Sequence, residues 1–121
     1  MIFDVPDPDF ERRIRGSFSR QGFNERVGAI LGRVTAGYVE IEVPFSAGVT
    51  QQHGLFHGGV MGVIGDSACG YAAMTLTPPN SEVLTISRVS PFRFSIDCSK
   101  RGKATHPNTP WQKCNAAAVG L

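Results

Sequence analysis

Apolar and polar positions recur at regular intervals in the first third of the chain. Phe10, Ile14 and Phe18 are spaced four residues apart, which places them on one face of a helix. Asp7 and Pro8 just before them are typical of a helix start, with aspartate as the cap and proline at the first helical position. This pattern predicts an amphipathic helix near the N-terminus.

Two strands are predicted next, over residues 29–34 and 38–43, joined by a turn at Ala36 and Gly37. The second strand alternates strictly: its apolar side carries Val39, Ile41 and Val43, and its other side carries Glu40 and Glu42. Such alternation is typical of a strand with one face in the core.

A long helix is predicted over residues 58–75, followed by a strand over residues 82–86. Gly58 and Gly59 open the helix and permit a tight junction with the preceding loop, because they have no Cβ. Its larger apolar residues recur at three- and four-residue spacing and suit burial: Val60, Val63, Ile64 and Tyr71. Its small residues would let another surface approach closely: Gly62, Gly65, Ala68, Gly70, Ala72 and Ala73.

Length and composition narrow the class of protein. A chain of 121 residues is expected to form one domain. We find no apolar run long enough to span a membrane and no signal peptide. The three cysteines, Cys69, Cys98 and Cys114, are odd in number and lack CxxC spacing, which favours a reducing, cytoplasmic compartment without disulfides.

The segment from Gln51 to Gly59, followed by Asp66, carries the candidate chemistry. The first N–H groups of a helix have no partner within it and carry partial positive charge, so they stabilise an oxygen that becomes negative in a reaction. Helical rise puts Asp66 about 10 Å beyond Gly59, too far for both to serve one reacting atom. They can meet if two copies of the helix lie antiparallel across a dimer axis.

These residues also have structural interpretations. Asp66 alone would suit a partly exposed helix position, His57 alone a hydrogen-bonded structural histidine, and Gln51 a turn. The His-Gly-Gly segment before Asp66 and the small apolar residues of the helix around it together favour a carboxylate that belongs to a site. His53 and His57 have the spacing of zinc ligands on a helix, but Gly54 argues against a helix there and no third ligand is evident, so we predict no metal.

Residues 22–86 resemble the hotdog fold, and specifically the PaaI-type acyl-CoA thioesterases of phenylacetate degradation. The similarity rests on His57, Gly58 and Gly59 followed by Asp66, after two strands. The matching segments are residues 21–23, 27–29, 37–44, 51–59, 66–73 and 83–86, a little over half of the chain. The resemblance implies an α+β fold in which an antiparallel sheet wraps a long central helix, incomplete here at the C-terminus.

The resemblance also implies roles for five residues. Asp66 matches the family's helical carboxylate, which acts as general base for water or as nucleophile. Gly58 matches the N–H that polarises the thioester carbonyl, and Gln51 a side-chain donor to the same oxygen. His57 matches a histidine that orients the site, and Thr85 falls near a serine or threonine that positions water. In the family the aspartate comes from one subunit and the glycine and glutamine from the other.

The function so implied is hydrolysis of an acyl-CoA to free acid and CoA, without a cofactor, in a homodimer or dimer of dimers. Three alternatives stay open: a non-catalytic acyl-CoA-binding hotdog protein, an inactive truncated thioesterase, and a dehydratase acting on acyl-CoA or acyl-ACP. The last would need a histidine as base.

The chain changes character after Ile86. Residues 1–86 carry six arginines and nine acids, a net charge of −3, whereas residues 87–121 carry six basic residues and one acid, a net charge of +5. We expect no nucleic-acid or membrane partner for this basic segment, because it lacks a binding motif, an aromatic series and an amphipathic helix.

Phe92, Phe94 and Ile96 alternate and predict one short strand, but Pro107 and Pro110 exclude a central strand in the polar run that follows. We therefore expect a partial thioesterase-like domain over residues 1–98 and an irregular basic tail over residues 99–121. Either the tail has diverged or is disordered, or the coding frame slipped near codon 86, which the charge shift favours. With too few strands, one apolar side of the long helix would be uncovered and the chain would aggregate without a partner.

Overall fold

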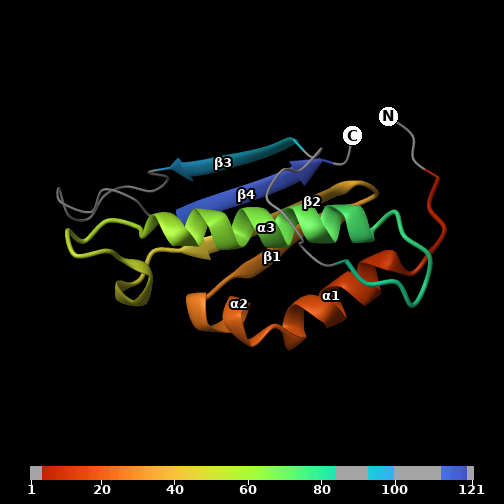
Figure 1. The fold of residues 1–121 in the computed structure, drawn as a ribbon, viewed down its shortest axis with the longest axis horizontal. Coiled ribbons are helices and arrows are strands. Elements are labelled where there is room, and N and C mark those ends of the chain that lie inside the picture. The colour runs from red at the N-terminus through yellow and green to blue at the C-terminus, as the bar shows by residue number, and fades with distance from the viewer. Residues whose placement is uncertain (1–3, 84–92, 100–112, 120–121) are drawn as a thin grey trace.

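The structure is a computed structural model that describes residues 4–83, 93–99 and 113–119. Within these residues, an antiparallel sheet of four strands in the order β1-β2-β4-β3 packs one face against a long helix, α3 (Figure 1). The elements in chain order are α1 (Phe10–Arg20), α2 (Gly22–Val27), β1 (Ile30–Thr35), β2 (Tyr38–Pro44), a 3₁₀ turn (Ala47–Val49), α3 (Gly58–Met74), β3 (Arg93–Ser99) and β4 (Lys113–Val119). The predicted α+β class, with an antiparallel sheet and a long helix, is confirmed.

Helix α1 has the predicted apolar face. Ile14 is fully buried, and Phe10 and Phe18 pack against the core. The helix begins at Phe10, later than the predicted cap at Asp7. The Asp7 carboxylate instead accepts a hydrogen bond from the Asp9 N–H at 3.0 Å, so it orders the turn that precedes the helix.

The predicted hairpin is confirmed by β1 and β2, which pair antiparallel around a turn in which Gly37 has a φ of 74°. Val39, Ile41 and Val43 are buried, while Glu40 and Glu42 on the other face are partly exposed. One face of β2 therefore belongs to the core, as its alternation indicates.

Helix α3 spans nearly all of the predicted range. Its buried residues are Val60, Ile64, Gly65, Ala68, Tyr71, Ala72 and Met74. Just past its end, the Thr75 hydroxyl accepts a hydrogen bond from the Gly37 N–H and donates one to the Ala72 carbonyl, each at 2.7 Å. This buried threonine ties the hairpin turn to the end of the helix.

The C-terminal segment corrects the sequence-based expectation. Residues 113–119 form β4, which lies between β2 and β3, so the prediction of irregular structure beyond Ser99 is wrong for these residues. Pro107 and Pro110, the grounds for that prediction, precede the strand, and the strand itself contains no proline. The short strand predicted from Phe94 and Ile96 is confirmed by β3.

Helix α3 contacts β2, β4 and β3, so the expectation that missing strands leave it uncovered is wrong for these elements. Of the strand predicted over residues 82–86, Glu82 and Val83 lie outside any strand. The remaining positions, 84–86, are outside the described residues. The division of the chain at residue 98 and the frame slip stay predictions.

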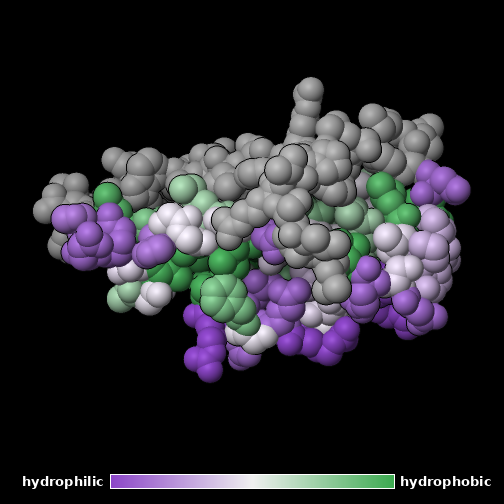
Figure 2. All heavy atoms as spheres, in the orientation of Figure 1, coloured by the Kyte–Doolittle hydropathy of each residue, from purple (hydrophilic) through white to green (hydrophobic). Residues whose placement is uncertain are grey.

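Hydrophilic side chains gather over α1 and α2, along the lower edge of the view in Figure 2. On α1 they include exposed ion pairs of Arg12 with Asp9 and of Arg15 with Glu11, which contribute little stability at a solvated surface. Among the helices of the described segments, none has the length and hydropathy needed to cross a membrane.

Candidate functional site

A closed loop leads the chain into α3. Thr50 and Phe56 form an isolated antiparallel bridge, and the His57 N–H donates to the Val49 carbonyl at 2.8 Å. Gly54, with a φ of 75°, lies at the tip of the loop, in a conformation that favours glycine. The bridge fixes where the helix starts and where its first N–H groups point.

Gln51 lies at one side of this loop. Its side-chain carbonyl accepts a hydrogen bond from the His53 N–H, and its backbone N–H donates to the Leu55 carbonyl at 2.8 Å. The side chain thus closes a turn, as its structural interpretation allows. In the described part of the chain the amide nitrogen, Nε2, has no acceptor, so this donor stays open.

His57 is the N-cap of α3. Its Nδ1 accepts a hydrogen bond from the Gly59 N–H at 2.8 Å, which satisfies one of the helix's first donors. The Gly58 N–H has no acceptor among the residues that the structure describes, and Gly58 is exposed. The open donor at this helix end is therefore that of Gly58, the residue singled out by the resemblance.

Asp66 lies further along the same helix. Eight residues of helical rise separate it from Gly58, or about 12 Å along the axis. Asp66 is exposed, while Ile64, Gly65 and Ala68 around it are buried. A single chain therefore holds Gln51, His57 and Gly58 at one end of α3 and Asp66 in its middle.

Asp66 borders a cleft of about 110 Å³ between α1, α3 and the segment after α3. Helix α1 contributes Ser17, its C-cap residue Gln21 lies beside it, and α3 contributes Tyr71. Gln21 Nε2 donates to the Tyr71 hydroxyl at 2.8 Å, and Ser17 Oγ lies 3.1 Å from that same hydroxyl. Burial raises the pKa of the Tyr71 hydroxyl above its ordinary value.

Sequence reasoning missed this polar cluster. The spacing of Tyr71 in α3 predicts only a core residue, and Gln21 belongs only to one of the matching segments. The two are 50 positions apart, so no local spacing pattern could have joined them.

Cys69 is close to Asp66 but is a poor nucleophile. Burial raises the pKa of its thiol, and the negative charge of Asp66 raises it further. A protonated thiol reacts slowly. Of these two side chains, the Asp66 carboxylate is therefore the stronger candidate for chemistry in this part of the helix.

Thr85, the least specific of the matches, is outside the described residues. Across residues 4–83, 93–99 and 113–119, no three His, Cys, Asp or Glu side chains gather as metal ligands would.

Comparison with known proteins gives matches in structure only. No family model and no curated protein matches the sequence. A thioesterase family protein from Silicibacter pomeroyi has a similar structure, with a TM-score of 0.64 and 25% identity over 91% of this chain and 94% of that one.

Two more distant structures are also similar. The phenylacetic acid degradation-related protein of Ralstonia eutropha gives a TM-score of 0.54 at 14% identity, over 93% of this chain and 98% of its own. The E. coli PaaI protein, from the phenylacetic acid degradation operon, gives 0.53 at 10% identity, over 93% and 94%. At these identities the two matches show the fold alone.

Proposed function

We propose that the protein hydrolyses acyl-CoA thioesters to free acid and CoA, as a hotdog-fold thioesterase like the similar protein from Silicibacter pomeroyi. The main supporting observation concerns α3. It carries an exposed carboxylate, Asp66, in a largely buried helix, and an open N–H at its start, at Gly58. These are the two kinds of group that ester hydrolysis needs.

In the proposed reaction the Gly58 N–H and the Gln51 amide donate to the thioester carbonyl oxygen and stabilise the negative charge that forms there. Asp66 removes a proton from water, whose oxygen bonds to the carbonyl carbon. The C–S bond then breaks, and the proton passes from Asp66 to the CoA thiolate. Attack by Asp66 itself, as a nucleophile, is the other route that the resemblance implies.

Gly58 and Asp66 of one chain are too far apart along α3 to act on the same thioester, so the proposed site needs two copies of the chain. We therefore propose a homodimer, or a dimer of such dimers. Asp66 of one copy would work with Gly58 and Gln51 of the other. Near the start of α3 the exposed residues are mostly glycines: Gly58, Gly59 and Gly62, beside Met61. Their lack of side chains would let the second copy approach this part of the helix closely. The odd number of cysteines and their lack of CxxC spacing favour a reducing compartment, and we propose a cytoplasmic protein.

The experiment that tests this function is the release of CoA from a panel of acyl-CoAs by wild type and by Asp66→Asn. Loss of a general base typically costs about 100- to 10,000-fold in rate, so we expect hydrolysis near background in the variant. Glu25→Gln, at an exposed position on α2, is the matched control and should keep the wild-type rate. An Asp66→Asn variant that hydrolyses at the wild-type rate contradicts the assignment.

The same assays separate the alternatives. Tight acyl-CoA binding with no CoA release over hours would indicate a binding protein. Hydration of 2-enoyl-CoA would indicate a dehydratase. The base for that reaction would have to be a histidine, and Nδ1 of His57 is already occupied by the cap of α3.

A further inference from the structure

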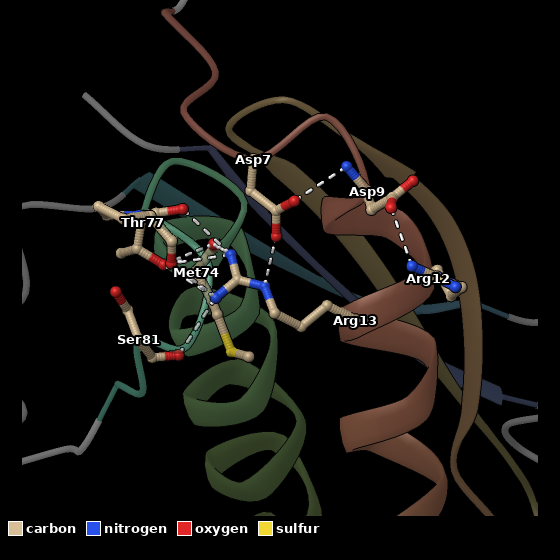
Figure 3. Close-up of polar contacts among 8 residues, drawn as sticks. Asp7, Asp9, Arg12, Arg13, Met74, Thr77 and Ser81 are labelled. Atoms are coloured by element: carbon tan, nitrogen blue, oxygen red, sulfur yellow. Dashed lines mark hydrogen bonds and ion pairs between the residues drawn. The ribbon is translucent and has the colours of Figure 1, made fainter.

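Arg13 of α1 donates hydrogen bonds to backbone carbonyls on both sides of the turn that follows α3. Arg13 Nη2 donates to the carbonyls of Met74 at 2.9 Å and Thr77 at 3.1 Å. Its Nη1 donates to the carbonyls of Pro78 at 3.1 Å and Ser81 at 3.2 Å (Figure 3). A single planar cation therefore binds four carbonyls spread over residues 74–81.

Asp7 fixes this guanidinium from the other side. Its Oδ2 lies 2.9 Å from Arg13 Nε, and its Oδ1 accepts from the Asp9 N–H (Figure 3). The Asp7 and Arg13 side chains are only 7% and 18% exposed. The pair is thus mostly shielded from water and oriented by hydrogen bonds at each end, unlike the exposed pair of Arg12 with Asp9.

The anchored turn borders the cleft beside Asp66. Met74, whose carbonyl Arg13 binds, lines that cleft, and so do Glu82 and Val83, which directly follow the bound Ser81. Arg13 does not line the cleft itself. It fixes the end of α3 and the start of the next segment, which form two of the walls.

We propose that Arg13 is a positioning residue for acyl-thioester binding, acting through the walls of the cleft that Asp66 borders; this role rests on the function proposed above. Asp66 keeps its own place without Arg13, since Ile64 and Ala68 secure that part of α3 in the core. Loosening the turn should therefore weaken substrate binding more than it slows the chemical step.

Arg13→Lys tests this role in the full chain. Lysine keeps the positive charge beside Asp7, but its compact ammonium lacks the planar fork of donors that reaches several carbonyls at once. With the acyl-CoA that wild type hydrolyses fastest, we expect KM to rise about tenfold and kcat to change by less than about threefold. The backbone N–H groups of residues 75–77 and 80–83 should exchange hydrogen faster.

Arg12→Lys is the matched control, because Arg12 lies on the same helix and forms an exposed ion pair. It should keep the wild-type KM. Asp7→Asn, which keeps the arginine fork but removes its ionic partner, should raise KM in the same direction by a smaller factor.

The outcomes are distinct. An Arg13→Lys variant with wild-type KM, or with a lowered kcat and unchanged KM, overturns the positioning role while the thioesterase function stands. A wild-type chain that hydrolyses no acyl-CoA overturns the proposed function and this role with it.

Discussion

At the scale of single residues, the two glycines that open α3 have different surroundings. A Cβ on Gly59 would lie 2.9 Å from His57 Nδ1, the acceptor of the Gly59 N–H, whereas a Cβ on Gly58 would meet nothing within 4 Å. The two are neighbours in one sequence motif, in which the resemblance assigns the N–H role to Gly58. The structure gives Gly59 to the cap and leaves the Gly58 N–H open.

This difference predicts opposite effects of alanine. Gly59→Ala should disturb the His57 cap and lower the free energy of unfolding by about 1 kcal/mol, within the range for lost helix caps. Gly58→Ala should leave stability unchanged but place a methyl group beside the open N–H, and so reduce the hydrolysis rate. Denaturant titrations and CoA-release assays on both variants measure this. A Gly58→Ala variant that is unstable but fully active per folded molecule would reverse the assignment.

The residues of the candidate site were predictable to different degrees. Gly58 and Asp66 follow from spacing along one helix, because helical rise fixes their separation. The cap formed by His57 was one of two open interpretations. The role of Arg13 could not be predicted from the sequence, because its carbonyl partners are 61 or more residues away. Every residue type also has a backbone carbonyl, so no residue pattern marks these partners.

At the scale of elements, predictability followed the length and strength of the local pattern. The strict alternation of β2 and the length of α3 place both elements closely, and β1 follows from the turn that joins it to β2. Helix α2 was not predicted, since six residues give too few turns for a periodic pattern, and its end is set by Gly28 with a φ of 72°. The start of α1 was misplaced because Asp7 uses its carboxylate for the preceding turn and for Arg13.

Thr75 joins two of these elements, and its removal should be costly. Thr75→Val keeps the side-chain shape but leaves the buried Gly37 N–H without its acceptor. An unsatisfied buried donor costs about 1–3 kcal/mol, and we expect a loss of that size in the free energy of unfolding. Thr35→Val, at an exposed position of β1, is the control and should change stability little. Equal stability of the two variants would contradict the role of this contact.

At the scale of the whole molecule, the sheet depends on a strand that the sequence did not predict. β4 pairs with β2 on one side and with β3 on the other, so it alone connects β3 to the hairpin within the described sheet. The local composition around the strand argued against it. Its place is set by pairing with residues far away in the chain, which tertiary structure decides and a local pattern does not.

The position of β4 can be tested at its middle. Ala117 pairs with Glu40 of β2 and with Ser95 of β3, so Ala117→Pro would remove a backbone donor from an interior strand. We expect this variant to lose the cooperative thermal transition of the 121-residue chain, while Ala117→Ser, which keeps the N–H, retains it. If Ala117→Pro melts like wild type, β4 does not hold the sheet together, and the tail is again best explained as an irregular addition. In that case the nucleotide sequence around codon 86 decides between a slipped frame and a diverged C-terminus.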